Sequence, residues 1–209
     1  IILACCGNPI YCLGEESEFQ RILTEMESDM EKLGASEIIA ACPLCYSTLK
    51  SLASFRLLSL YEVIAEQGLP EPAKKAEWTF SLHDSCPTRY EKGVQESVRN
   101  LVKQMGYQIE EMEYSRDKTR CCGMGGMVAY ANLKLSNRII KRRAAEAKYD
   151  ILTYCASCRE AFAFFGKPSL HILDLIFNPD WQEERLKPAK LRRERRENQA
   201  LLKSQLEVI

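Results

Sequence analysis

Apolar side chains fall three or four residues apart over the stretch 15–33, and Gly34 follows as a stop signal. This spacing predicts an amphipathic helix that packs against a sheet, and it is carried by Phe19, Ile22, Leu23, Met26, Met30 and Leu33. Weaker signals of the same kind predict further helices over 46–53, 59–65, 90–105, 128–148 and 159–165, with glycine stop signals at positions 68, 106 and 166.

Short apolar runs lie between these helices and predict strands over 1–4, 37–41, 78–83, 107–112 and 151–154. The apolar stretch 170–177, which contains His171, is interpreted as a helix at the edge of the sheet. Strands that alternate with helices are typical of α/β layers with a mostly parallel sheet. The expected fold class is therefore α/β, in two similar halves related by a pseudo-twofold axis, with a metal cluster near their interface.

A repeated segment divides the chain into these halves. Residues 37–45 (EIIAACPLC) align with residues 150–158 (DILTYCASC), and each copy follows a Cys-Cys-Gly sequence and precedes a helix and a Ser-Leu-Tyr or Ser-Leu-His sequence, at 59–61 and 169–171. Two copies of one unit explain this order better than coincidence. The expected organisation is a first repeat over 1–69, a linker with two prolines over 70–77, a second repeat over 78–180 and a charged helical tail over 181–209.

Composition and charge are those of a globular protein rather than of a nucleic-acid-binding or membrane-spanning one. The 209 residues are 46% hydrophobic and 28% charged, and 29 Lys and Arg residues balance 29 Asp and Glu residues. No apolar run reaches the ~18 residues of a membrane-spanning helix, and acidic residues interrupt the basic run of the tail. We expect a cytoplasmic protein that binds no nucleic acid, with docking on a peripheral membrane complex left open.

Ten cysteines are many for this length, and their spacing favours metal binding over disulfides. No signal peptide is recognisable, and adjacent pairs and Cys-x-x-Cys spacings suit thiolate ligands in a reducing cytosol. The central motif is 119–126 (TRCCGMGG), where glycines let bare backbone amides approach a bulky inorganic ligand. Gly123, Gly125 and Gly126 are therefore candidate cofactor-binding residues.

The two copies differ in one cysteine. Cys86 precedes the pair Cys121-Cys122 by roughly one βαβ unit, whereas the same offset before Cys5 falls ahead of residue 1. The sequence also begins without Met. We expect that the chain begins partway through its first repeat and that an upstream segment carries the missing cysteine. Cys12 matches no motif position and is interpreted as a packed or half-exposed thiol.

The order Cys, gap, Cys-Cys-Gly, gap, Cys-x-x-Cys resembles the cysteine-rich CCG domain of the heterodisulfide reductase B subunit and its iron–sulfur relatives, over roughly residues 1–177. The resemblance implies an unusual, noncubane 4Fe-4S cluster on five cysteines, Cys86, Cys121, Cys122, Cys155 and Cys158. The matching residues of the first half, where a second cluster, a zinc ion or no metal is expected, are Cys5, Cys6, Cys42 and Cys45.

The resemblance also implies an oxidoreductase that is one component of a larger redox complex. Its cluster would transfer electrons to or from a thiol/disulfide or a small organic redox substrate, and partner subunits would carry flavin or 4Fe-4S clusters. His83 and Asp84 precede Cys86 and are candidates for a proton relay, although a strand-end turn explains them as well. Two alternatives stay open: a zinc-stabilised structural or partner-binding module without redox turnover, and a metal-free dithiol oxidoreductase.

Overall fold

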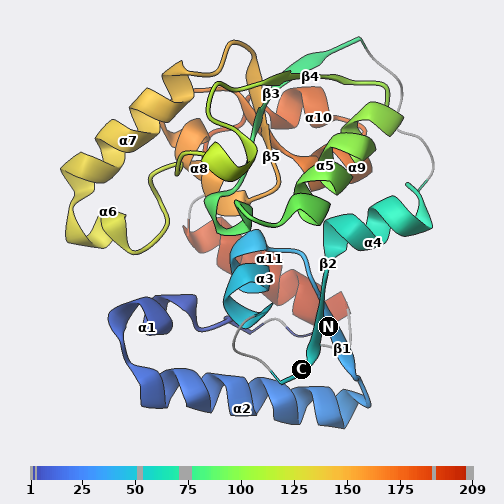
Figure 1. Ribbon diagram of the computed structural model, residues 1–209, viewed down its shortest axis with the longest axis vertical. Helices are drawn as coiled ribbons and strands as arrows, with labels where there is room; N and C mark the ends of the chain where they lie inside the picture. The colour runs from blue at the N-terminus through green and yellow to red at the C-terminus, as the bar shows by residue number, and fades with distance from the viewer. Residues whose placement is uncertain (1, 3, 51–53, 71–76, 190–191, 206–209) are drawn as a thin grey trace.

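The computed structural model in Figure 1 describes the chain except residues 1, 3, 51–53, 71–76, 190–191 and 206–209. The strands of the described part form two parallel sheets. The smaller sheet pairs β1 (Glu37–Ala40) with β2 (Arg56–Ser59). The larger sheet has the order β4-β3-β5-β6, with β3 at Thr79–His83, β4 at Gln108–Glu111, β5 at Asp150–Thr153 and β6 at Ser169–His171. The predicted α/β class is confirmed.

Helices connect the strands. The first half contains α1 (Asn8–Leu13), α2 (Glu16–Leu33), α3 (Pro43–Lys50) and α4 (Leu60–Gln67). The second half contains α5 (Lys92–Gln104), α6 (Val128–Ala131), α7 (Leu133–Ala145), α8 (Ala156–Phe164), α9 (Ile172–Phe177), α10 (Trp181–Glu184) and α11 (Arg192–Gln205), with short 3-10 helices η1 (Cys86–Thr88) and η2 (Arg116–Lys118). Among the described residues, no helix combines the length and apolar character needed to cross a membrane.

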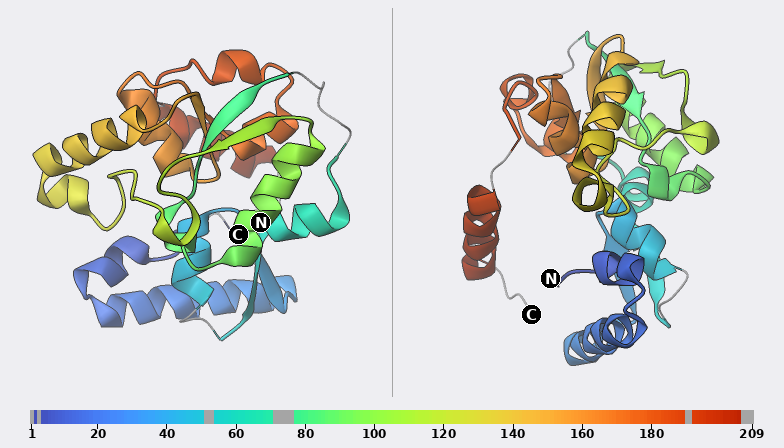
Figure 2. Two further views of the ribbon diagram at one scale, coloured as in Figure 1. Left: turned by 45° about the horizontal axis from the view of Figure 1, so that its top comes forward. Right: turned by 90° about the vertical axis from the view of Figure 1, so that its left-hand side faces the viewer.

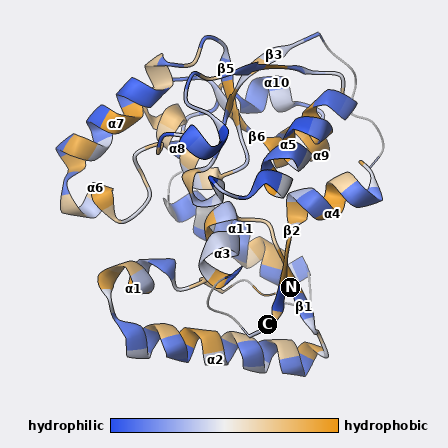
Figure 3. Ribbon diagram, in the orientation of Figure 1, coloured by the Kyte–Doolittle hydropathy of each residue, from blue (hydrophilic) through white to orange (hydrophobic). Residues whose placement is uncertain are grey.

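The helix predicted over 15–33 is confirmed as α2, which ends at Gly34 and mixes apolar and polar residues along its length in Figure 3. The prediction of one continuous helix over 128–148 is wrong, because the structure has two helices there, α6 and α7. Asn132 separates α6 from α7, because its backbone leaves the helical conformation and its side chain accepts a hydrogen bond from the N–H of Leu135. This contact caps the start of α7.

Several shorter segments also differ from the prediction. α1 and β2 were not predicted, since α1 has no buried side chain and β2 is only four residues long. His171 ends β6 and caps α9 instead of lying inside a helix, with Nδ1 accepting from the N–H of Leu173.

In the predicted strand 1–4, residues 1 and 3 lie outside the described part, and Ile2 and Ala4 have no regular secondary structure. The predicted helix 46–53 begins earlier, at Pro43, and positions 51–53 are also outside that part.

Both halves contain the order strand, Cys-x-x-Cys, helix, strand, helix, as β1-α3-β2-α4 and β5-α8-β6-α9. The alignment of the two Ser-Leu sequences is wrong by two residues. Ala40 pairs with Ser59, whereas Thr153, which holds the same place before its cysteine motif, pairs with His171. Ser59 and His171 are therefore equivalent, and each is the N-cap of the next helix. The pseudo-twofold axis and the linker over 70–77 stay predictions.

Alternate residues of the larger sheet face two separate cores, as expected for a parallel sheet covered on both faces. Phe80 and Leu82 of β3 and Leu152 of β5 pack in the core that contains α5 and α9. Ile151 of β5 packs on the other face, with residues of α7 and α8. The first of these cores also contains Tyr61 of α4, so it continues into the first half of the chain. The two halves are thus joined by shared apolar packing.

The charged tail predicted over 181–209 begins too early, because Trp181 of α10 is buried in the core that contains α5 and α9. Its later part forms α11, which Figure 2 shows standing to one side of the two halves. Apart from the half-buried Leu202, its described side chains are exposed. This agrees with a mixed-charge helix that lies mostly in solvent.

A buried ion pair closes the carboxyl end of β3. Asp84 is fully buried and accepts hydrogen bonds from Arg99 Nη1 at 3.1 Å and Nη2 at 2.8 Å. It also accepts from the N–H of Arg116 at 2.7 Å and from the hydroxyl of Tyr154 at 3.2 Å. Burial by itself would raise the pKa of Asp84, but the contacts with Arg99 outweigh it and leave this pKa below its usual value. The charge of Asp84 therefore links α5, β3 and β5.

Arg99→Met is expected to lower the free energy of unfolding by about 3–5 kcal/mol, because Asp84 would remain as an unpaired buried charge. Urea denaturation of the metal-free protein measures the effect. The matched control is Arg21→Met, which removes an exposed pairing with Glu18 and is expected to leave stability nearly unchanged. Equal losses in the two variants would show that the buried pair contributes no more than a surface contact.

Candidate metal centre

The carboxyl ends of β3 and β5 lie next to each other, because the strands are parallel neighbours with His83 opposite Thr153. The chain adds β4 on one side of β3, and then β5 and β6 on the other. The carboxyl ends of strands at such a change of direction form the crevice where α/β proteins bind ligands. Cys86 begins η1 after β3, and Cys155 is the N-cap of α8 after β5. Strand pairing thus brings together two cysteines that are distant in sequence.

The Cys-Cys-Gly loop of the second half is tied to the same edge. The hydroxyl of Thr119 donates to the carbonyl of Asp84 at 2.8 Å, and Arg89 Nη2 donates to the carbonyl of Thr119 at 2.6 Å. Beyond the cysteine pair, the hydroxyl of Ser136 donates to the carbonyl of Gly123 at 2.7 Å. The loop is held on both sides of its two cysteines.

The five thiols of the second half interact in the order Cys86, Cys121, Cys122, Cys158, Cys155. Hydrogen bonds from the Cys122 and Cys86 thiols lower the pKa of Cys121 to about 2. A hydrogen bond from Cys158 likewise lowers the pKa of Cys155. The thiols that donate these bonds have a raised pKa, since each must keep its proton. The structure therefore gathers the five predicted ligands; their binding of a metal stays a prediction.

His83 lies beside this group of sulfurs. A ring nitrogen of His83 and the sulfurs of Cys122 and Cys158 all lie within 4.8 Å of one another, and the three side chains are buried. Nε of Arg143 donates to Nδ1 of His83 at 3.1 Å. Burial, and then the nearby Arg143 charge, lower the pKa of His83 to about 3, so the ring is neutral near pH 7. The proton relay through His83 and Asp84 stays a prediction.

The candidate glycines contribute backbone amides and tight packing. The N–H of Gly123 donates to Cys121 Sγ at 3.2 Å, and that of Gly125 also helps to lower the pKa of Cys121, after the contacts with neighbouring thiols. Gly123 has φ 102°, and a Cβ at this position would lie 2.7 Å from Ile140 Cγ1 and 2.9 Å from the carbonyl oxygen of Ser136. Glycine is therefore required where this loop packs against α7.

In the first half, three of the four candidate cysteines approach one another. Contacts with the Cys45 thiol, which has one proton to share between them, lower the pKa of Cys42 to about 6 and that of Cys6 to about 7, and the same contacts raise the pKa of Cys45. Amides of the first turn of α3 add to the effect on Cys42. Cys5 has an exposed side chain. The first half thus presents a compact group of three thiols with a fourth cysteine adjacent in sequence.

One tyrosine joins the two Cys-x-x-Cys motifs. The hydroxyl of Tyr61 lies 2.8 Å from the carbonyl oxygens of both Ala41 and Tyr154, which directly precede Cys42 and Cys155. The ring is buried and packs edge-on against Tyr154, with ring centroids 5.5 Å apart. Burial, together with the nearby cysteines of both motifs, raises the pKa of Tyr61. The two cysteine groups therefore adjoin each other, with Tyr61 between their backbones.

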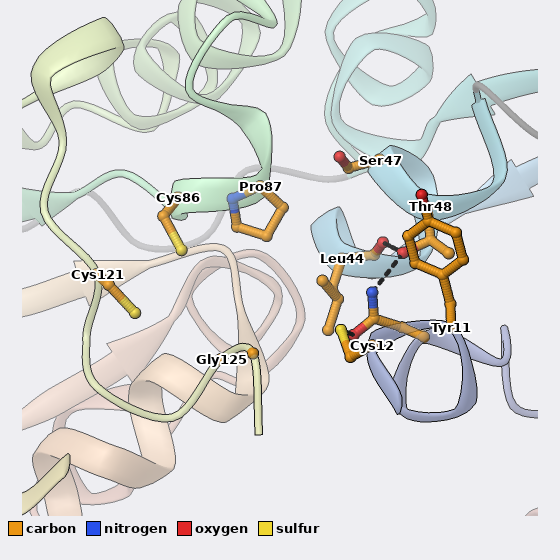
Figure 4. A pocket seen from close by; sticks show the side chains of 11 residues that line it. Tyr11, Cys12, Leu44, Ser47, Thr48, Cys86, Pro87, Cys121 and Gly125 are labelled. Carbon is orange, nitrogen blue, oxygen red and sulfur yellow. Dashed lines mark hydrogen bonds between the residues drawn. The ribbon is translucent and has the colours of Figure 1, made fainter. Parts of the chain in front are cut away.

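A pocket of about 500 Å³ opens in front of the second-half cysteines. Its described lining residues include no lysine, arginine, histidine, aspartate or glutamate. Figure 4 shows residues of the second half facing residues of α1 and α3 across it, with Cys86, Pro87, Cys121 and Gly125 on one side and Tyr11, Cys12, Leu44, Ser47 and Thr48 on the other. The interpretation of Cys12 as a packed or half-exposed thiol is wrong, since its side chain is exposed. Cys12 lies across the pocket from Cys86 and Cys121.

Sequence reasoning missed the contributions of Tyr61 and Arg143. Tyr61 occurs in a short apolar run, and the only available signal was its place in the repeated segment. Arg143 occurs in the basic sequence Lys141-Arg142-Arg143, which is typical of a solvated helix face. Its side chain is instead fully buried. The role of each side chain depends on a partner that is distant in sequence: Tyr154 for Tyr61 and His83 for Arg143.

Comparison with known proteins identifies one matching family. The profile of a family described as a cysteine-rich domain, CCG, matches residues 3–50 and 80–163. These segments contain all nine cysteines of the two motifs.

The relatives found include three whose names illustrate redox and iron–sulfur proteins. An EtfAB:quinone oxidoreductase of Syntrophomonas wolfei is 29% identical over 130 residues, 58% of this chain and 18% of its own length. An uncharacterized iron–sulfur protein of Methanocaldococcus jannaschii is 29% identical over 161 residues, 74% of this chain and 32% of its own length. One component of the dihydromethanophenazine:CoB–CoM heterodisulfide reductase of Methanosarcina barkeri is 28% identical over 175 residues, 74% of this chain and 42% of its own length. The chain spans less than half the length of each relative.

Gly123→Ala is expected to lower the free energy of unfolding by about 2–4 kcal/mol, because strain at positive φ adds to the clash with α7. The matched control is Gly126→Ala. Gly126 also has a positive φ, of 60°, but open space surrounds the position of its Cβ, so a loss of only about 1 kcal/mol is expected. Denaturation of the metal-free variants measures both values, and equal losses would contradict the close packing of Gly123.

Tyr61→Phe is expected to lower the free energy of unfolding by about 1–3 kcal/mol, since the carbonyl oxygens before both cysteine motifs lose their shared donor. Tyr90→Phe serves as the control, because Tyr90 is 80% exposed and its hydroxyl should contribute less than about 0.5 kcal/mol. The comparison is made by urea denaturation. A Tyr61 variant as stable as the Tyr90 variant would rule out a structural link through this hydroxyl.

Proposed function

The chain belongs to the CCG cysteine-rich domain family, and on that premise we propose that it is an iron–sulfur oxidoreductase subunit or domain. It transfers electrons through a noncubane 4Fe-4S cluster, to or from a thiol/disulfide or a small organic redox substrate. The observation that carries this proposal is the gathering of five interacting thiols at the carboxyl ends of β3 and β5, namely Cys86, Cys121, Cys122, Cys158 and Cys155.

The donor set of the second half fits an iron–sulfur cluster. Thiolates are the usual ligands of such clusters, and five thiols exceed the four ligands of a structural zinc site. Metal binding would replace the protons that now hold the thiols together, because cysteine ligates as the thiolate. The lowered pKa values of Cys121 and Cys155 favour the thiolate form that metal binding requires.

When bound, the cluster supplies one-electron transfer and iron that can accept a sulfur ligand. The five thiols would hold it, and the amides of Gly123 and Gly125 would stabilise negative charge on the sulfur of Cys121. The pocket of Figure 4 gives a small molecule access to Cys86 and Cys121. Because its described lining contains no lysine, arginine or histidine, a multiply charged anion would lose hydration there without gaining an ion pair, and a neutral substrate is favoured.

The first half is proposed to hold a second metal, as a further cluster or a zinc ion. Cys6, Cys42 and Cys45 supply three thiols, and the exposed Cys5 is the fourth candidate. This site belongs to the repeat over 1–69 and the main site to the repeat over 78–180. Tyr61 contacts both motifs, so the two metals would be neighbours.

The proposed partners are other redox subunits or domains that carry flavin or 4Fe-4S clusters, in the cytoplasm or in a complex at the membrane surface. Two relatives support this proposal through their names, since one is an EtfAB:quinone oxidoreductase and another is a component of a heterodisulfide reductase. The chain matches only part of each. The complete reaction is therefore assigned to the assembly rather than to these residues alone.

A zinc-stabilised binding module without redox turnover is the second candidate. One observation favours it: His83, Cys122 and Cys158 present nitrogen and sulfur atoms within 4.8 Å of one another, and zinc takes such ligands. This candidate requires neither sulfide nor electron transfer.

Anaerobically purified protein is expected to contain iron and acid-labile sulfide in equal amounts, with visible absorbance that dithionite bleaches. Cys122→Ser should lose most of the iron and sulfide, because Cys122 lies in the middle of the group of thiols. Cys12→Ser is the matched control and should keep both, since Cys12 lies across the pocket. Zinc without sulfide in the unaltered protein would favour the second candidate, and cluster loss in both variants would contradict the proposed ligand set.

A further inference from the structure

His83 places an unpartnered nitrogen at the carboxyl end of β3. The side chain is fully buried, and Nε2 has no hydrogen-bond partner within the described residues. Buried polar atoms are seldom left unpaired, because they lose their contact with water and gain nothing in exchange. The unpaired atom points to a bound group that the chain itself does not supply.

The other ring nitrogen determines where the proton of His83 resides. Nε of Arg143 donates to Nδ1 at 3.1 Å, and a guanidinium keeps its protons in proteins. Nδ1 is therefore the acceptor of this hydrogen bond and carries no proton. A neutral imidazole then has its proton on Nε2. The buried Nε2 is a hydrogen-bond donor, and in this tautomer it has no lone pair for a metal.

Arg143 is fixed in the position that selects this tautomer. Its Nη1 donates to Glu146 at 2.7 Å, and its Nη2 donates to the carbonyl of Tyr114 at 2.6 Å. The His83 ring packs edge-on against Phe162, with ring centroids 5.0 Å apart. These contacts hold both the orientation of the ring and the placement of its proton, as residues behind a metal site commonly do.

Two cysteine sulfurs lie close to the ring of His83. A ring nitrogen of His83 lies within 4.8 Å of the sulfurs of Cys122 and Cys158. We propose, on the basis of the function proposed above, that His83 donates an N–H···S hydrogen bond from Nε2 to a sulfur of the bound cluster on its Cys122 and Cys158 side. The bond raises the reduction potential of the cluster, because a donor to sulfur stabilises the more negative, reduced state.

Ser85 is a second buried donor two residues further along the chain. Its side chain is fully buried, and a hydrogen bond from its hydroxyl adds to the lowered pKa of Cys155, after the contact with Cys158. The segment from His83 to Cys86 thus directs the hydroxyl of Ser85 at a candidate ligand and leaves Nε2 of His83 for the bound group.

The test is a redox titration of the cluster-loaded protein, followed by electron paramagnetic resonance. His83→Phe keeps a ring but removes the donor, so the midpoint potential should shift to a more negative value. His83→Gln places an amide N–H near the position of Nε2 and should restore most of the shift. His171→Asn is the control, because His171 is the only other histidine of the sequence and caps α9. The midpoint potential of the cluster should not change in this variant.

Pulsed measurements on the unaltered, cluster-loaded protein with nitrogen-15 histidine provide a readout that needs no variant of His83. A weak coupling to one histidine nitrogen is expected, and it should persist in His171→Asn. A strong coupling, as from an iron–nitrogen bond, would overturn the proposal, as would an unchanged potential in a fully loaded His83→Phe variant.

Failure of the proposed function can be distinguished from failure of the His83 proposal, because no paramagnetic cluster would then form in the unaltered protein. The tautomer can still be read in that case from the nitrogen-15 resonances of the metal-free protein. A proton on Nε2 supports the assignment of His83 as a donor. A proton on Nδ1 would overturn it.

Discussion

Parallel pairing of β3 with β5 is the constraint on which the rest of the site depends. Because His83 is opposite Thr153, the segments that follow the two strands leave the sheet at one edge and bring Cys86 and Cys155 to it. The Cys-Cys-Gly loop reaches the same edge through a hydrogen bond from Thr119 to the carbonyl of Asp84, directly after β3. The cysteines are thus gathered by an ordinary feature of α/β sheets, a change of strand direction along the sheet.

Two buried arginines hold the end of β3 from opposite faces of the sheet. Arg99 pairs with Asp84, and Arg143 donates to the neighbouring His83. Each arginine has additional acceptors, a carboxylate of Glu111 for one and of Glu146 for the other, as buried charges require. The first pair fixes the backbone that leads into Cys86, and the second fixes the proton of a ring that faces the sulfurs. At the end of β3, Asp84 therefore stabilises the fold, while its neighbour His83 is the residue proposed to adjust the reduction potential of the cluster.

The sequence predicted what local chemistry determines. Apolar spacing was sufficient for α2, and the repeated Cys-x-x-Cys segment was sufficient for the strand-to-helix units β1-α3 and β5-α8, but neither β2 nor β6 was predicted. It failed where a tertiary contact decides the outcome. His171 was placed in a helix, but pairing with Thr153 makes it the last residue of an edge strand. Arg143 and Tyr61 carry no sequence signal of their own, since burial against His83 or between two carbonyl groups is a property of the assembled fold.

The central claim is that one group of five sulfurs binds an iron–sulfur cluster. Anomalous diffraction at the iron absorption edge, from crystals grown anaerobically, tests it most directly. The account predicts an iron peak, too extended for one ion, surrounded by the sulfurs of Cys86, Cys121, Cys122, Cys155 and Cys158. Iron bound elsewhere on the chain, or these five thiols left without iron in a protein that is otherwise active, would contradict the account.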